Sequence, residues 1–173
     1  MLAKLILSII IIASAGIIGY VLAYRYVQRN QQLKNLHIAF QLLETEIMYS
    51  SSSLPMALKR VGLKSNSPIG SFFTETYKIL DSRLGYGIEE AWSRTVEDTI
   101  SETSLNHEDK EVLLDFGFNL GSTDKEHQIK NFQFIYLQLK KRQDDAENLR
   151  MKNEKMFKNL GILIGIAIVI IFI

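Results

Sequence analysis

The chain of 173 residues has no cysteine and only two prolines, and its formal net charge is only +1. Each of these low values limits the kind of protein that the chain can be. Without cysteine, a disulfide framework, a thiolate metal site and a cysteine nucleophile are all excluded. A net charge close to zero argues against general nucleic-acid binding, which needs a clustered positive surface. So few prolines leave long helices uninterrupted. The composition therefore favours a helical protein that binds no nucleic acid.

Charge is also absent from two long runs, residues 5–24 and 159–173. The first run has the length of about 20 residues that a helix needs to cross a hydrocarbon core of about 30 Å. The second run, counted from Leu160, reaches about 21 Å, so it needs a snorkelling Lys158 or a thinner bilayer to cross. The sequence predicts an N-terminal transmembrane helix at 1–24, a domain at 25–158 and a C-terminal transmembrane helix at 159–173.

The first run also allows a second interpretation, a cleaved signal peptide. Lys4, a short apolar core and Ala13-Ser14-Ala15 resemble the three regions of such a peptide, and cleavage would leave a mature chain that begins at Gly16. That chain would be a secreted or cell-surface helical domain held by its C-terminal anchor. The apolar run continues past this site and is followed by Arg25 and Arg29, which favours a retained anchor.

Basic residues gather on the inner side of both apolar runs, next to the middle domain. Only Lys4 lies beyond either run. Because Lys and Arg stay on the cytoplasmic side of a membrane, we expect a cytoplasmic domain with both termini across the membrane. The flanking basic residues are Arg25, Arg29, Lys34, Arg150, Lys152, Lys155 and Lys158.

Between the two runs, apolar residues recur three and four positions apart, which is the spacing of amphipathic helices. No segment alternates apolar and polar residues with period two, so we predict no sheet. The predicted fold class is therefore all-α, a cytoplasmic helical bundle of about six helices. Its first and last helices continue into the N- and C-terminal transmembrane anchors.

Local signals predict where these helices begin. The serines at 50–53 end the first helix, and the last of them caps a short second helix with Pro55 in its first turn. Asn106 caps the fifth helix. Thr123 and Glu126 form a capping box that opens the long last helix.

Glycines predict where helices end or approach each other. The third helix is expected to extend to Leu84 and to stop at Gly85. Gly121 is expected to be the left-handed stop of the fifth helix. Within that helix, Gly117 lies beside the apolar face and predicts a close helix crossing.

Small residues form a stripe on each predicted anchor. Ala15, Gly19 and Ala23 are four positions apart on the first, and Gly161 and Gly165 are four apart on the second. Stripes of this kind let two helices approach closely in a membrane. We therefore predict that the chain's own two anchors pack against each other through these five residues.

Acidic residues dominate the middle helices, where Arg94 and Lys110 are the only basic residues between Glu89 and Asp115. This polarity fits either a solvated surface or a docking face for a basic cytoplasmic partner, because complementary charge speeds encounter and fixes register. The candidate docking residues are Glu89, Glu90, Glu97, Asp98, Glu108, Asp109, Glu111 and Asp115.

Patterns of catalytic or metal-binding residues are absent from the sequence. His37, His107 and His127 fall on separate predicted helices, and no second histidine follows His107 at the spacing of a helical zinc site. The sequence also lacks a phosphate-binding loop and a Gly-x-Ser-x-Gly nucleophile turn. Glu44 and Glu46 are two apart and cannot share a helix face as an acid/base pair. We predict a protein that is not an enzyme and uses no metal or cofactor, so any ATP-driven step comes from a partner.

Three blocks of the sequence resemble the stage III sporulation protein AB family, and they run in order from end to end. The first block is ETEIMY at residues 44–49, followed by SLP at 53–55 and AL at 57–58. The second is EDKEVLLDFG at 108–117, continuing through LGSTD at 120–124, and the third is RMKNEKM at 150–156 with LG at 160–161. The order Leu54-Pro55 departs from the family's Pro-Leu, which puts only the start of that helix in doubt.

The resemblance implies a protein that is essential for endospore formation and sits in the mother-cell membrane around the forespore, within the apparatus that links the two cells. It implies a helical domain similar to the cytoplasmic domain of type II secretion and type IV pilus platform proteins, which contact a hexameric ATPase. The implied partners are membrane lipids and other stage III sporulation proteins, including the AA ATPase of the same set, with self-association left open. The family's motifs are not catalytic, so no active-site residue is implied.

Overall fold

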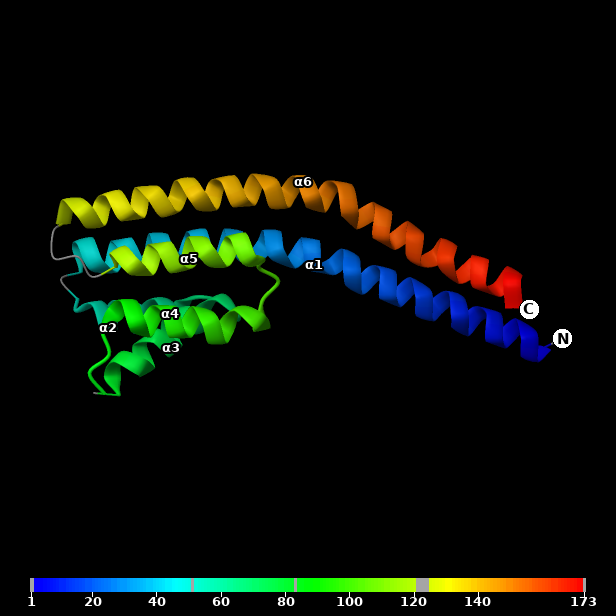
Figure 1. Cartoon of the computed structure of the whole chain (residues 1–173), viewed down its shortest axis with the longest axis horizontal. Coiled ribbons are helices and arrows are strands. Elements are labelled where there is room, and N and C mark those ends of the chain that lie inside the picture. Colours follow the sequence, from blue (N-terminus) through cyan, green and yellow to red (C-terminus); the bar gives the residue numbers. More distant parts are fainter. Residues whose placement is uncertain (1, 51, 83, 121–124, 173) are drawn as a thin grey trace. The chain divides into compact units, whose positions relative to one another are not determined.

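The structure is a computed structural model that describes residues 2–50, 52–82, 84–120 and 125–172 (Figure 1). In this described part the chain forms six α-helices and one short 3₁₀ helix, without a strand, as the all-helical prediction required. The helices are α1 (Leu2–Tyr49), α2 (Leu54–Lys64), α3 (Ile69–Asp81), α4 (Ile88–Thr99), η1 (Ile100–Glu102), α5 (His107–Asn119) and α6 (Lys125–Phe172).

The chain divides into two compact units, and the long helices α1 and α6 contribute to both. The terminal unit comprises Met1–Asn30 and Asp145–Ile173, and the central unit comprises Gln31–Asp144. The central unit therefore contains all the short helices, from α2 to α5, together with one half of each long helix.

Several predicted helix boundaries are confirmed by the structure. Ser53 is the N-cap of α2, with proline in the first turn. Asn106 caps α5, and its side chain accepts a hydrogen bond from the backbone N–H of Asp109. The predicted capping box from Thr123 and the predicted stop at Gly121 lie outside the described residues.

The prediction that the third helix reaches Leu84 is wrong. Helix α3 ends at Asp81, where the hydroxyl of Ser82 donates a 2.6 Å hydrogen bond to the carbonyl oxygen of Ile79. Gly85 follows with φ +83°, a left-handed conformation that few other residues adopt easily. Leu84 is consequently outside the helix and 72% exposed.

Aromatic side chains fill the core of the central unit. Phe40 of α1 lies 4.5 Å from Phe116 of α5, measured between ring centroids, and Phe73 of α3 lies 5.5 Å from Trp92 of α4. Phe132 of α6 completes the cluster at 5.5 Å from Phe116. All five side chains are buried, and pairs in these tilted and edge-on arrangements add about 0.5–1.5 kcal/mol each beyond the burial of their area. One core therefore joins five helices.

Gly117 gives this core the close crossing that the sequence predicted. A Cβ atom added at Gly117 would collide with the indole ring of Trp92. The Trp92 indole N–H in turn donates a 2.7 Å hydrogen bond to the carbonyl oxygen of Leu113, so the buried ring has its polar atom satisfied. Helices α4 and α5 are thereby fixed against each other.

The terminal unit consists of an antiparallel pair of helices, the N-terminal part of α1 and the C-terminal part of α6 (Figure 1). Among the described residues, one helix, Lys4–Tyr49, has the length and composition that a membrane crossing requires. Its most apolar window has a mean hydropathy of 2.6 and is only 6% buried. The apolar side chains of this window therefore mostly face outward.

Candidate functional site

The two helices of the terminal unit meet at glycine backbones. A Cβ atom added at Gly19 would lie 2.6 Å from the carbonyl oxygen of Phe157 and 2.9 Å from the Cα of Gly161. One added at Gly161 would lie 2.8 Å from the carbonyl oxygen of Ala15. Side chains larger than hydrogen cannot occupy either position unless the helices separate.

The contact continues toward both ends of the stripe. A Cβ atom added at Gly165 would lie 2.9 Å from the Cα of Ile12 and 3.1 Å from the Cβ of Ala15. Ala23, one turn beyond Gly19 on α1, is fully buried. The structure thus brings the predicted small residues to one side of each helix, where α1 and α6 approach each other; their role in a membrane stays a prediction.

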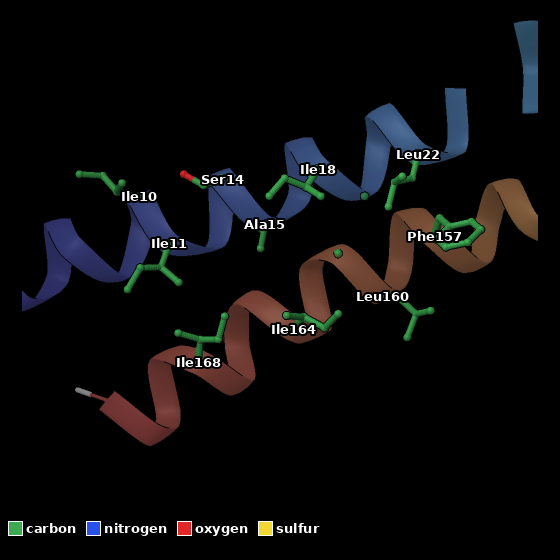
Figure 2. Close-up of a pocket in the computed structure, with 12 residues that line it drawn as sticks. Ile10, Ile11, Ser14, Ala15, Ile18, Leu22, Phe157, Leu160, Ile164 and Ile168 are labelled. Carbon is green, nitrogen blue, oxygen red and sulfur yellow. The ribbon is translucent and has the colours of Figure 1, made fainter. Parts of the chain in front are cut away.

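Two apolar grooves flank this helix pair. The first groove has a volume of about 560 Å³ and, apart from Ser14, is lined by apolar residues and glycine. Figure 2 shows Ile11 and Ala15 on the side of α1 that faces α6, with Ile164 and Ile168 opposite them. The second groove has a volume of about 440 Å³ and is lined by Ala13, Gly16, Ile17, Tyr20, Lys158 and Ile162.

Aromatic rings follow the apolar part of the helix pair. The rings of Tyr26 and Phe157 stack across the pair with centroids 5.7 Å apart, and Tyr20 stacks on Tyr24 at 6.1 Å. The ammonium of Lys158 lies 5.5 Å from the centroid of Tyr20. Tyrosines beside basic residues are typical of the interface between hydrocarbon and water.

Beyond the aromatic rings, charged side chains form a ladder along α6. Glu154 accepts hydrogen bonds from Lys158 at 2.7 Å and from Arg150 at 3.2 Å, and Arg150 donates to Glu147 at 2.6 Å. Asn30 of α1 donates to Glu147 and so ties the two helices together. The hydrogen bond from Lys158 is the main reason that the pKa of Glu154 lies below its ordinary value.

The central unit carries the acidic candidate residues on α4 and α5. Glu108, Glu111 and Asp115 are three and four positions apart, so they share one exposed face of α5. Three of the eight candidates pair with cations of the chain itself. These pairs are Glu90 with Arg94, Glu97 with Lys110 and Glu108 with Arg142.

The other candidates differ in exposure. Asp109 is buried, and its carboxylate accepts a 3.0 Å hydrogen bond from the backbone N–H of Asn106, which completes the capping box of α5. Glu89, Asp98 and Asp115 are exposed and make no ion pair with the described residues. Glu111 is also exposed and lies 3.8 Å from His107. Seven of the eight candidates are therefore exposed, and the part of the acidic face that is not paired with the chain's own cations is smaller than the sequence indicated.

Glu44 and Glu46 bind different parts of the central unit, an arrangement that the sequence did not predict. Glu44 accepts a 2.7 Å hydrogen bond from the hydroxyl of Tyr136, 92 positions away. Glu46 pairs with Arg60 at 2.9 Å and Lys64 at 3.2 Å, and the hydrogen bond from Arg60 above all lowers the pKa of Glu46. No local signal foretells either contact, because each partner lies on another helix.

The three histidines lie on three different helices, α1, α5 and α6. His37 packs against Tyr136 with ring centroids 5.1 Å apart, and burial and then the charge of Lys140 lower its pKa. His107 is on α5 and His127 on α6. Across the residues that the structure describes, no three histidine or carboxylate side chains converge as metal ligands would.

Comparison with known proteins gives one consistent result. The family model described as "Stage III sporulation protein AB" matches residues 4–173. The stage III sporulation protein AB of Bacillus subtilis (strain 168) is 30% identical over 168 residues, which cover 97% of this chain and 98% of the relative. A solved structure of stage III sporulation protein AB matches with a TM-score of 0.68 and 28% identity, covering 72% of this chain and 98% of the solved one.

Proposed function

Because the chain belongs to the stage III sporulation protein AB family, we propose that it is a non-enzymatic membrane platform subunit of the channel between mother cell and forespore. The terminal unit lies in the mother-cell membrane, and the central unit stands in the mother-cell cytoplasm. There it docks a secretion-type ATPase, the AA member of the same sporulation set. Other stage III proteins surround it in the membrane, and self-association stays open.

The observation that carries the membrane part is the outward-facing apolar surface of the terminal unit. Ile9, Ile17 and Ile18 of α1 are 62–64% exposed, and Ile170 and Ile171 of α6 are 77% and 74% exposed. In water this surface would be an unfavourable apolar patch, whereas in lipid it is solvated and the helical backbone satisfies its own hydrogen bonds.

The basic residues beside the terminal unit's aromatic rings support a cytoplasmic central unit. Arg25, Lys152 and Lys155 are exposed at the ends of the apolar segments that lead toward the central unit. Cations at this position are retained on the cytoplasmic side during insertion. The proposal therefore places α2 to α5 where a cytoplasmic ATPase can reach them.

The docking part rests on the carboxylates that remain exposed on α4 and α5. Glu111 and Asp115 share a face of α5 and are not needed for the capping box or for a tight ion pair. Because both side chains are exposed, we expect that reversing their charges leaves the core of the central unit unchanged. They are therefore the best places to test docking without unfolding the protein.

We expect the purified full chain, in detergent or in lipid nanodiscs, to bind the purified ATPase, and the double variant Glu111→Lys/Asp115→Lys to bind at least tenfold more weakly. In the double variant, the attraction between the acidic face and a basic ATPase surface would become repulsion. Binding of the unaltered chain would weaken as the salt concentration increases, because salt screens the attraction. Surface plasmon resonance at two salt concentrations measures both effects.

The matched control reverses two carboxylates elsewhere in the central unit, Glu75→Lys/Asp81→Lys on α3. Glu75 makes only an exposed pair with Lys78, so its loss has little effect on stability. Equal binding by both double variants and the unaltered chain would remove the docking part of the proposal. Equal loss in both would mean that net charge, and not this face, governs binding.

A further inference from the structure

We propose that the terminal unit binds an anionic phospholipid, with one acyl chain in the second groove and the headgroup phosphate at Lys155 and Lys158. This inference rests on the proposed insertion of the terminal unit in the membrane. It assigns to the helix pair a binding site of defined chemistry, beyond its role as an anchor.

The groove has room for an acyl chain because two small residues, Ala13 and Gly16, lie on its α1 wall beside Ile17 and Tyr20. Ala13 and Gly16 of α1 lie opposite Ile162 of α6, and a Cβ atom added at Gly16 would meet only Ile162, at 3.9 Å. The helices therefore leave the space of about 440 Å³ open on the side where Gly16 lies. An apolar chain in this space contacts protein on two sides.

One end of the groove carries positive charge. Lys158 lines the groove, and its ammonium lies 5.5 Å from the centroid of the Tyr20 ring. Lys155, Lys158 and Ile162 are three and four positions apart, so they share one face of α6. Lys155 is exposed, one turn nearer to water than Lys158. A headgroup above the acyl chain would meet both ammonium groups.

In the part of the chain that the structure describes, the neighbouring carboxylates pair with Arg150 and Lys158 but not with Lys152 or Lys155. Glu154 and Glu147 share Arg150 between them, and Glu154 also accepts a hydrogen bond from Lys158. Lys152 and Lys155 make no ion pair with the described residues and are exposed. The excess positive charge at this end therefore comes from Lys152 and Lys155, and the phosphate of a lipid headgroup would neutralise it.

The charge of Lys158 favours a lipid over a partner helix as the occupant of the second groove. A transmembrane helix laid over the second groove would cover Lys158 with apolar side chains, which is unfavourable for a charged group. A phospholipid brings an acyl chain to the apolar wall and an anion to the lysines together. The first groove, which is lined by apolar residues, glycine and Ser14, has no cation among its lining residues.

The test uses the full chain, extracted with a mild detergent from vesicles of equal parts phosphatidylglycerol and phosphatidylcholine. Native mass spectrometry counts the phospholipids that stay bound. We expect phosphatidylglycerol to be retained over phosphatidylcholine. One basic residue near an anionic surface is worth about a fivefold change in binding, so Lys155→Gln/Lys158→Gln should lower this preference by about 25-fold.

Two further variants separate the site from general charge attraction. Lys130→Gln/Lys141→Gln removes two exposed lysines of α6 in the central unit and should keep the preference unchanged. Gly16→Leu fills the groove while keeping every charge, and should reduce the bound lipid several-fold. Equal retention of the two lipids by the unaltered chain, or full retention by Gly16→Leu, would overturn the proposal.

Extraction at alkaline pH distinguishes this inference from the proposed function on which it rests. If the unaltered chain is washed from the vesicles at pH 11, the proposed membrane insertion fails and the lipid site fails with it. If the chain stays in the vesicles and shows no lipid preference, the lipid site alone is wrong. Retention in the vesicles together with the preference supports both.

Discussion

A half-buried hydrogen bond between Tyr136 and Glu44 joins the two long helices inside the central unit. Burial first, and then the hydrogen bond and charge of Glu44, raise the pKa of the Tyr136 hydroxyl. A tyrosine whose pKa is raised on folding stabilises the protein below its unfolded pKa of about 10, and that contribution is lost as the pH rises above this value. The residue is therefore a pH-dependent link between α1 and α6.

We expect Tyr136→Phe to lower the free energy of unfolding by about 1–2 kcal/mol at pH 7, since a hydrogen bond to a carboxylate is lost. Above pH 10 the difference between the variant and the unaltered chain should shrink. Urea unfolding, followed by the fluorescence of the single, buried Trp92, measures this across pH.

The matched control is Tyr49→Phe, because Tyr49 is 84% exposed. It should leave the stability unchanged at both pH values. A difference between Tyr136→Phe and the unaltered chain that stays constant from pH 7 to pH 11 would contradict the assigned pKa shift.

Other charged residues in the sequence blocks that resemble the family also make contacts with residues of the same chain. Asp109 completes the cap of α5, Glu46 joins α1 to α2, and Lys110 pairs with Glu97. The cap could be predicted, because Asn106 and Asp109 are three positions apart and their interaction is local. The pair between Tyr136 and Glu44 could not, because it depends on how α1 and α6 pack.

At the scale of the helices, local signals predicted starts better than ends. Proline, serine and asparagine fixed the starts of α2 and α5, since capping involves only neighbouring residues. Helix α3 ended three residues earlier than Leu84 because the Ser82 hydroxyl competes for backbone hydrogen bonds. Apolar character alone therefore overestimated the length of this helix.

The close approach of α1 and α6 in the terminal unit makes a cross-linking prediction possible. The Cβ of Ala15 lies 3.1 Å from a Cβ added at Gly165, slightly closer than the roughly 3.5–4.5 Å that a disulfide needs. A small separation of the two helices, which would also relieve the 2.9 Å contact of the added Cβ with the Cα of Ile12, brings the pair into range. In this chain without cysteine, Ala15→Cys/Gly165→Cys should form an intramolecular disulfide when isolated membranes are oxidised with a lipid-soluble oxidant. A shift in mobility on a non-reducing gel, reversed by reductant, detects the product.

A control pair should not react. Ile9→Cys/Gly165→Cys moves the thiol to an exposed position of α1, at 63% exposure, away from the glycine contact. Cross-linking of both pairs with equal yield, or of neither, would contradict the packing of the two helices through their small residues.

At the scale of the whole molecule, the charge-free runs and the basic residues beside them carried the prediction of a membrane protein. Hydropathy depends on composition and needs no tertiary structure, so these runs could be recognised directly. The division into units could not, because α1 and α6 each extend through both units without a break in the sequence. The extent of the unpaired acidic surface could not be predicted either, because the ion pair between Glu108 and Arg142 depends on how α5 and α6 pack.

The central unit is proposed to face the cytoplasm from a membrane-inserted terminal unit. Single cysteines at two exposed positions, Asp81→Cys on α3 and Ser101→Cys in η1, report on this in a chain that has no other thiol. In protoplasts that express either variant, a membrane-impermeant maleimide should label neither cysteine until the membrane is permeabilised. Labelling of both cysteines in intact protoplasts would place the central unit outside the cell and contradict the account.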